Sequence, residues 1–195
     1  MDWEGIYKRN SLEEIPWHSE KPPVSLEENL KKIKVGNALE VCSGAGTNSI
    51  FLAKKGFKVE GIDISKTVVE IAKKRAKKEN LDIDFRTGNV LDLNERKKFE
   101  FVFDRGCFHH MPTESREKFV KNIFRSLKEN GKFQIMAFSE KNKGIRKGFS
   151  KSELRKIFSK YFKIGKIEEE IHLEPDNSMV FLYTALMTKK AQKAA

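Results

Sequence analysis

Hydrophobic and polar positions follow one another along the chain in blocks that predict strands alternating with helices. The apolar run at residues 38–41 leads into the glycine-containing segment CSGAG, and residues 47–55 then show helical spacing. Residues 58–64 alternate as a second strand, and Ser65 is placed to cap the helix that follows. The pattern therefore predicts two consecutive strand–helix units.

The alternation continues through the middle of the chain. Residues 83–89 and 99–104 are predicted as the third and fourth strands, and the second of these has the near-continuous apolar character of a buried parallel strand. Apolar positions between residues 119 and 127 predict a helix that ends at the ENG segment, residues 129–131. Residues 132–139 then form a fifth strand.

The C-terminal part of the chain breaks this alternation. Ser150 and Glu153 stand in capping-box spacing and predict the start of a last helix. Residues 162–173 and 179–189 are both strand-like, and the turn-rich link EPDNS is too short for a crossover helix, so the two strands should pair antiparallel. The chain is therefore predicted to be an α/β protein with a mostly parallel sheet, helices on both faces and a C-terminal antiparallel hairpin.

The chain of 195 residues is long enough for one well-buried domain. We expect this domain to span residues 35–190. Residues 1–34, rich in Trp, Pro and Glu, fall outside the alternation and are predicted to form a helical or irregular arm, and residues 191–195 a flexible tail.

Composition adds limits to this picture. The net charge of +11 would suit a nucleic-acid partner, but the lysines are spread through the helices beside glutamates, which favours a solvated surface. No apolar run reaches the roughly 20 residues of a membrane span. The N-terminal residues lack the order of a secretion signal. Together with the two cysteines, Cys42 and Cys107, this predicts a cytoplasmic protein without a disulfide framework.

Polar residues at the predicted strand ends indicate a nucleoside site. Gly44 and Gly46 allow the backbone to approach a ligand, and Asp63, twenty-three residues after Glu40, stands where an acid usually accepts hydrogen bonds from ribose hydroxyls. A dinucleotide-binding fingerprint, G-x-G-x-x-G, would place its third glycine at residue 49, where this chain has Ser49. A ligand with one nucleoside and a short zwitterionic tail fits this pattern better than a dinucleotide.

Several segments in order resemble the class I S-adenosylmethionine-dependent methyltransferases. These segments are LEVCSGAGTNSIFLAKKG, VEGIDIS, GNVLDL, FEFVFDRGCFHHMP and LKENGKFQIM, and the resemblance covers about residues 35–190. It implies a Rossmann-like seven-stranded sheet, S-adenosyl-L-methionine as cofactor and S-adenosyl-L-homocysteine as product. One departure is Cys42, which replaces a glycine common in the family; a small residue filling the turn is favoured over a reactive thiol.

The resemblance also implies roles for particular residues. Glu40 and the glycine-turn backbone should hold the methionine part of the cofactor, and Asp63 its ribose. Asn89 or Val90 should contact the edge of its adenine, and Ile64 the face. Asp92 is a second candidate for the adenine amino group, and its alternative is a loop aspartate facing water. The residues expected to contact the cofactor are Trp17, Glu40, Cys42, Ser43, Gly44, Gly46, Asp63, Ile64, Asn89, Val90, Asp104 and Arg105, the last two through backbone carbonyls.

The segment FDRGCFHHM, residues 103–111, brings together residue types that could bind metal. The chain offers too few further Cys or His residues for a zinc site, and methyl transfer needs no covalent intermediate on a cysteine, so we expect no metal. Cys107 is then a small residue in the bend. His109 or His110 is predicted to orient the acceptor or to act as its base, the alternative being a packed structural histidine.

The predicted acceptor is a small molecule. Residues 104–110, DRGCFHH, lack the motif of methyltransferases that act on amino groups of nucleic-acid bases. The N-terminal arm resembles the lid of the thiopurine, thiol and tellurite methyltransferase group, with Trp17 as lid aromatic and Tyr7 as acceptor contact; core packing is the alternative for Trp3 and Trp17. A thiol, chalcogen or metalloid acceptor is therefore favoured.

Two other functions remain open from the sequence. The basic surface could serve an RNA or protein methyltransferase, and the cofactor site could belong to a non-catalytic binding module. The identity of the acceptor depends on the arm and on the loop at residues 139–150, and the choice between monomer and homodimer is not made by the sequence.

Overall fold

The computed structural model describes residues 1–174 and 177–191, with the exception of the side chain of Ile145. Residues 192–195 of the predicted tail and residues 175–176 of the predicted hairpin link lie outside this description. The strands are β1 (Asn37–Val41), β2 (Lys58–Asp63), β3 (Asp84–Thr87), β4 (Phe99–Arg105), β5 (Leu127–Phe138), β6 (Phe162–Leu173) and β7 (Met179–Lys189).

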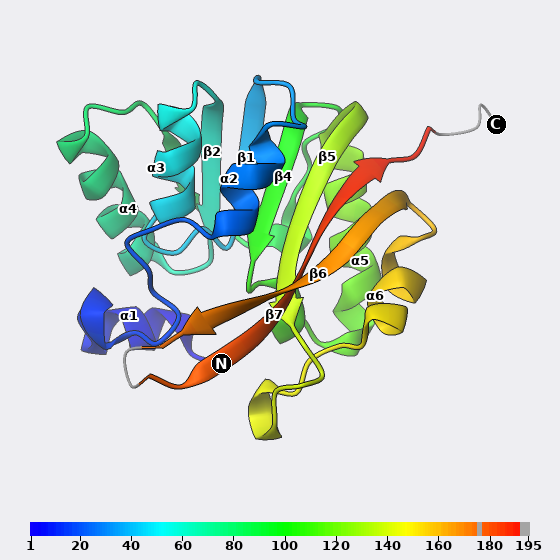
Figure 1. Ribbon diagram of the computed structural model, residues 1–195. Coiled ribbons are helices and arrows are strands. Elements are labelled where there is room, and N and C mark those ends of the chain that lie inside the picture. Colours follow the sequence, from blue (N-terminus) through cyan, green and yellow to red (C-terminus); the bar gives the residue numbers. More distant parts are fainter. Residues whose placement is uncertain (175–176, 192–195) are drawn as a thin grey trace.

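These strands form one sheet, in the order β3-β2-β1-β4-β5-β7-β6 (Figure 1). Neighbours from β3 to β5 pair parallel, and β7 runs antiparallel to both β5 and β6. The strand order reverses between β1 and β4, because β2 lies on one side of β1 and β4 on the other. The predicted mostly parallel sheet with a C-terminal antiparallel hairpin is confirmed.

Helices cover both faces of the sheet (Figure 1). One hydrophobic cluster joins α5 and α6 to one face, and a second joins α2, α3 and α4 to the other. The helices are α1 (Trp3–Arg9), α2 (Val24–Leu30), α3 (Thr47–Lys54), α4 (Lys66–Lys78), α5 (Thr113–Ser126) and α6 (Lys151–Phe158), with four short 3-10 turns between elements. The predicted capping box at Ser150 is confirmed, since its hydroxyl accepts a hydrogen bond from Glu153 N. The predicted cap at Ser65 is confirmed as well, since its hydroxyl accepts a hydrogen bond from Val68 N.

The apolar run of β4 reflects burial on both faces. Phe101 and Phe103 belong to the cluster under α2, α3 and α4, whereas Val102 between them belongs to the opposite cluster, and all three are fully buried. Burying one such phenylalanine stabilises the fold by about 1.5–3 kcal/mol. β4 is therefore a firm base for the loop that follows it.

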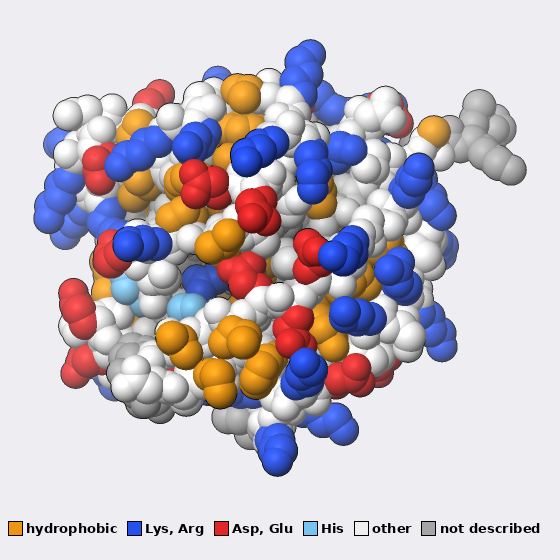
Figure 2. Space-filling model, in the orientation of Figure 1, with side chains coloured by type: hydrophobic (Ala, Val, Ile, Leu, Met, Phe, Trp, Pro, Cys, Tyr) orange, Lys and Arg blue, Asp and Glu red, His pale blue; other side chains and the backbone are white. Residues whose placement is uncertain are grey.

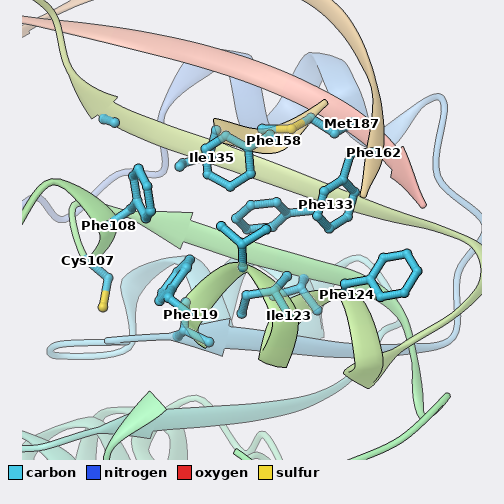
Figure 3. Packing of buried hydrophobic residues seen from close by; sticks show 14 of the residues in the cluster. Cys107, Phe108, Phe119, Ile123, Phe124, Phe133, Ile135, Phe158, Phe162 and Met187 are labelled. Carbon is cyan, nitrogen blue, oxygen red and sulfur yellow. The ribbon is translucent and has the colours of Figure 1, made fainter. Parts of the chain in front are cut away.

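Phe108 anchors that loop in the core. Its ring is fully buried and lies 5.3 Å from that of Phe119 and 5.0 Å from that of Phe158, in the group of aromatic rings shown in Figure 3. Because Phe108 is fixed, the next two residues of the chain, His109 and His110, are held at the end of the sheet.

One predicted boundary is wrong. The helix expected to end at residues 129–131 ends at Ser126, and β5 already begins at Leu127, which pairs with Phe99. The register then shifts between Phe99 and Phe101, so the ENG segment forms an irregularity in the strand. Leu127 is fully buried in the core, and this contact with β4 overrides the helical spacing.

Candidate functional site

A cavity of about 390 Å³ lies at the carboxyl ends of the parallel strands, where ligands bind in open α/β sheets. Its walls come from the loops after β1, β2 and β4, and the N-terminal arm closes it. Figure 2 shows histidine side chains and a basic side chain in the region between α1 and the tip of β6. The cavity is lined by Met1, Trp3, Tyr7, Trp17, His18, Ser19, Glu40, Cys42, Ser43, Gly44, Ala45, Thr47, Asn48, Ile62, Asp63, Ile64, Gly88, Asn89, Val90, Arg105, Gly106, Cys107, His109, His110, Met111, Phe138, Arg146, His172, Glu174, Val180 and Leu182.

The loop after β1 has the backbone that its glycines predict. Gly44 has φ +51° and lies at the cavity. Gly46 has φ +78°, and a Cβ added there would lie 2.7 Å from the ring of Phe85, so glycine is required for packing as well as for conformation. Gly46 was expected to contact the cofactor, but it is not among the residues that line the cavity.

Asp63 connects this loop to the end of β2. Its carboxylate accepts hydrogen bonds from Gly44 N at 2.9 Å and from Ser65 N at 3.0 Å. The side chain is buried and lines the cavity, and burial raises its pKa above the usual value. Each carboxylate oxygen retains acceptor capacity, so Asp63 can receive hydrogen bonds from two neighbouring hydroxyl groups.

Glu40 in β1 places a buried carboxyl group at the cavity. It accepts hydrogen bonds from Asn48 Nδ2 at 2.7 Å and from Ser49 Oγ. Burial raises the pKa of Glu40 to about 7, against the lowering effect of these hydrogen bonds and of the more distant Arg105. A ligand with a positive group at this place would favour the ionised carboxylate.

The expected adenine wall lies at the ends of β2 and β3. Ile64 exposes 52% of its surface, which is unusual for isoleucine and leaves an apolar face free to stack. Asn89 and Val90 also line the cavity, and the Asn89 side chain accepts from Leu91 N. Asp92 does not line it; this side chain is exposed and pairs with Lys118 at 3.4 Å.

Asp104 was expected to contact the cofactor through its backbone carbonyl, and its side chain has a structural role. Its fully buried carboxylate accepts from Cys107 N at 2.7 Å and from Phe108 N at 3.0 Å, and it is not among the cavity-lining residues. Burial raises the pKa of Asp104 to about 7. The side chain therefore shapes the turn after β4, and Arg105 and Gly106 face the cavity in its place.

The two cysteines form a disulfide, which the sequence did not predict. Cys42 and Cys107 are 65 residues apart, but their Cα atoms lie 5.7 Å apart because β1 and β4 are adjacent and parallel. Cys42 also has φ +50°, a left-handed conformation that glycine adopts more readily than other residues. The bond joins two walls of the cavity, and it leaves neither cysteine as the free small residue that was expected.

The two histidines of the loop differ in what their rings can do. Nδ1 of His109 accepts a hydrogen bond from Phe138 N at 3.0 Å, and the ring stacks on Phe138 at a centroid distance of 3.6 Å. Burial lowers the pKa of His109 well below its usual value, so the neutral ring carries its proton on Nε2. His109 can thus donate a hydrogen bond into the cavity but has no free lone pair for a proton.

His110 lies beside it, and among the described residues neither of its ring nitrogens has a hydrogen-bond partner. Its ring contacts that of Trp3 edge-on at 4.9 Å. Burial lowers its pKa, so the ring is neutral near pH 7. Of the two candidate bases, only His110 combines a neutral ring with a free lone pair.

The N-terminal arm forms the aromatic roof. Trp17 Nε1 donates to the hydroxyl of Tyr7 at 3.1 Å, and Trp3 packs edge-on against Trp17 at 5.5 Å. Burial raises the pKa of Tyr7 to about 12, which keeps its hydroxyl neutral and unsuited to accept a proton. Trp17 exposes 38% of its surface and lines the cavity, so it has a face available to a ligand.

Polar contacts hold this arm on the sheet domain. The Glu4 carboxylate accepts from Ser65 Oγ at 2.6 Å, from Thr67 Oγ1 at 2.8 Å and from Thr67 N at 3.1 Å, at the N-terminus of α4. These hydrogen bonds lower the pKa of Glu4 to about 2. Thr47 Oγ1 also donates to Ser19 O at 2.8 Å.

Sequence reasoning missed the wall formed by the C-terminal half of the sheet. Arg146 follows β5, and His172, Glu174 and Leu182 come from the β6–β7 hairpin. No motif marks these residues, because they reach the cavity only when the hairpin is added to β5. Arg146 lies within the loop on which acceptor choice was predicted to depend.

Two features are absent from the described part of the chain. No helix there is long and apolar enough to cross a membrane. Residues 1–174 and 177–191 also contain no group of three or more His, Cys, Asp or Glu side chains that could hold a metal ion.

Comparison with known proteins places this site in context. The family model described as a methyltransferase domain matches residues 38–131. An uncharacterised methyltransferase of Schizosaccharomyces pombe is 32% identical over 108 residues, which are 55% of this chain and 74% of that protein. The 2-heptyl-1-hydroxyquinolin-4(1H)-one methyltransferase of Mycobacteroides abscessus is 24% identical over 176 residues, 85% of this chain and 78% of that protein.

A solved structure has the same fold over nearly the whole chain. It concerns the conversion of a disulfide bond into a thioacetal group during echinomycin biosynthesis. Its TM-score is 0.83 at 20% identity, and the match covers 96% of this chain and 91% of that one.

Proposed function

The chain belongs to the class I S-adenosylmethionine-dependent methyltransferases, and from this premise we propose that its methyl acceptor is a small molecule held beneath the N-terminal arm. The observation that carries this proposal is the shared cavity. The residues expected to bind the cofactor, apart from Gly46 and Asp104, and the aromatic residues of the arm line one space of about 390 Å³. This volume is within the range of sites for small ligands.

The residues present fit the cofactor. Ile64 offers an exposed apolar face for adenine, and Asp63 retains acceptor capacity for ribose hydroxyls. The raised pKa of Glu40 marks a carboxyl group that a ligand amino group would stabilise in its ionised form. Ser43, Gly44, Asn89 and Val90 complete the proposed contacts. When bound there, S-adenosylmethionine supplies a methyl group activated by a positive sulfur.

The protein's own contribution is to position the acceptor and exclude water. Trp17 and Trp3 cover the cavity, and Tyr7 holds Trp17 in place through its hydroxyl. His109 is proposed to orient the acceptor by donating from Nε2, while His110 accepts a proton from an acceptor that arrives protonated. The sequence indicated no preference between these histidines, whereas this proposal assigns orientation of the acceptor to His109 and the role of base to His110.

A thiol, chalcogen or metalloid acceptor is the favoured class. The likeness of the arm to the lids of thiopurine, thiol and tellurite methyltransferases supports it, and the sulfur chemistry of the structural neighbour is consistent with it. The hydroxyquinolone relative supports testing aromatic hydroxyl compounds as well. The experiment is a coupled assay for S-adenosylhomocysteine release over thiols, metalloid oxyanions, aromatic hydroxyl compounds, amines and carboxylates. If no small acceptor is turned over, the proposal fails.

The basic surface supports an alternative acceptor, RNA or protein. Figure 2 shows lysine and arginine side chains spread over one face and interspersed with acidic ones, rather than gathered into a single stripe. This distribution favours a solvated surface. Including tRNA in the same assay tests the alternative, since turnover of tRNA without turnover of small molecules would support it. A non-catalytic module would release no product with any acceptor.

A further inference from the structure

Arg105 presents a cation at the cavity without an anionic partner. It ends β4, lines the cavity, and donates from Nη1 to Trp17 O at 3.3 Å and from Nη2 to His172 Nδ1 at 3.2 Å. Its Nε is buried and has no hydrogen-bond partner among the described residues. No carboxylate in the described part of the chain lies within 4 Å of its guanidinium nitrogens.

His172 does not neutralise this charge. Arginine can only donate, so Nδ1 of His172 must be the acceptor and the histidine ring is neutral. Burial and the charge of Arg105 lower the pKa of His172, against the raising effect of the Pro16 backbone and of Glu174 and Glu170, which agrees with a neutral ring. Glu40 and Glu170 act on Arg105 only through longer-range attraction.

A second arginine in the same wall provides a comparison. Arg146 also lines the cavity, but its guanidinium pairs with Glu174 at 2.7 Å, and Glu174 is buried. One cavity-lining arginine thus has its counter-ion within the protein, and the other has only neutral acceptors. A guanidinium with only neutral acceptors gains from an anionic oxygen, because charge-assisted hydrogen bonds are about twice as strong as neutral ones.

Aromatic rings near Arg105 indicate the shape of the group that could bind beside it. Trp17, whose carbonyl accepts from Arg105, lines the cavity together with Phe138 and its stacked His109. Flat rings on the walls suit a planar group next to the anion. We propose that the acceptor carries an anionic oxygen group, such as a carboxylate or comparable oxyanion, that binds the guanidinium of Arg105 next to an aromatic wall; this inference rests on the proposed small-molecule function.

The test uses benzoate and benzamide, which share size and planarity and differ in charge. Their binding to the full chain saturated with S-adenosylhomocysteine is measured by calorimetry. We expect benzoate to bind about tenfold or more tightly than benzamide, and Arg105→Gln to remove this preference. Arg155→Gln is the matched control, since Arg155 is exposed on α6 and its loss removes the same charge far from the cavity; it should keep the preference.

The outcomes separate this inference from the proposed function. Equal binding of the two probes, a preference retained in Arg105→Gln, or no benzoate binding at 10 mM, about the limit of the assay, would overturn the anion proposal. Arg105→Lys should retain part of the preference, because it keeps the charge but loses the fork of donors. Failure of the wild-type chain to bind S-adenosylhomocysteine would instead refute the cofactor site. A circular dichroism melt like that of the wild-type chain shows that Arg105→Gln is folded.

Discussion

Asp63→Asn is the sharpest test of the cofactor site. The wild-type carboxylate already accepts from Gly44 N and Ser65 N, and it is proposed to accept from both ribose hydroxyls as well. Asparagine keeps one acceptor oxygen, but its amide nitrogen must face one of the two backbone donors. The substitution therefore removes the charge and places two donors against each other.

The expected loss follows from these contacts. A hydrogen bond to a charged group contributes about 1.5–3 kcal/mol and one between neutral groups about 0.5–1.5 kcal/mol. The difference is about 1–1.5 kcal/mol per hydrogen bond, so the two ribose hydroxyls lose about 2–3 kcal/mol together, which corresponds to an affinity for S-adenosylhomocysteine about 30-fold to 160-fold weaker. Isothermal titration calorimetry with S-adenosylhomocysteine measures this directly.

Asp92→Asn is the matched control for this experiment. Asp92 undergoes the same chemical change, but it is exposed, pairs with Lys118 and does not line the cavity. We expect its affinity to stay within about twofold of the wild-type value, as is usual for changes at exposed sites. Circular dichroism melts should show that both variants are folded. If folded Asp63→Asn bound S-adenosylhomocysteine within about threefold of wild type, the assignment of the ribose site would be refuted.

Four further predictions concern the groups around this site. The pKa of Glu40 is raised to about 7, so the native state holds a proton that the unfolded chain releases above about pH 4.5. This group therefore lowers the free energy of unfolding as the pH rises from 4.5 to 7. A bound amino group favours its ionised form, so calorimetric affinity for S-adenosylhomocysteine should rise from pH 6 to pH 8 and become flat in Glu40→Gln; a wild-type profile without slope would contradict this. Glu4→Gln should weaken the docking of the arm and increase limited proteolysis within residues 1–34, and equal protease sensitivity of variant and wild type would count against the docking role. With an acceptor that must lose a proton, His110→Ala should lower kcat by about 100-fold or more. The activity of this variant should no longer fall in the acid range, where His110 of the wild-type protein becomes protonated. Full activity of the variant would exclude His110 as the base. Peptide mapping without reductant should find Cys42 and Cys107 in one linked pair, whereas reaction of both with a thiol reagent in the unreduced native protein would show that the bond is absent.

Local pattern determined most of the fold. The alternation of apolar residues predicted the strands because each strand side chain points to one face or the other, and β4 reads as continuously apolar because both of its faces are covered. Ser150 and Glu153 predicted a helix start through contacts that span three residues. Such features depend on neighbours in the sequence, so the sequence alone contains them.

The convergence of the residues proposed to bind the cofactor was predictable for a related reason. Parallel strands bring their carboxyl ends to one edge of the sheet, so Glu40, Gly44 and Asp63 had to converge once the strands were recognised. The start of β5 at Leu127 could not be predicted in this way, because burial against β4 decided it rather than the local helical spacing.

Tertiary structure alone decided the chemistry of the remaining wall. The pairing of Cys42 with Cys107 follows from the adjacency of β1 and β4, and the proton position on His109 follows from the backbone N–H of Phe138, 29 residues away. Arg105 was expected to contribute only its backbone. The charge of its side chain is available to a ligand because the β6–β7 hairpin brings a neutral His172, rather than a carboxylate, to the guanidinium. The sequence specifies which side chains exist, but hydrogen bonding and charge balance between distant segments determine what each of them can do.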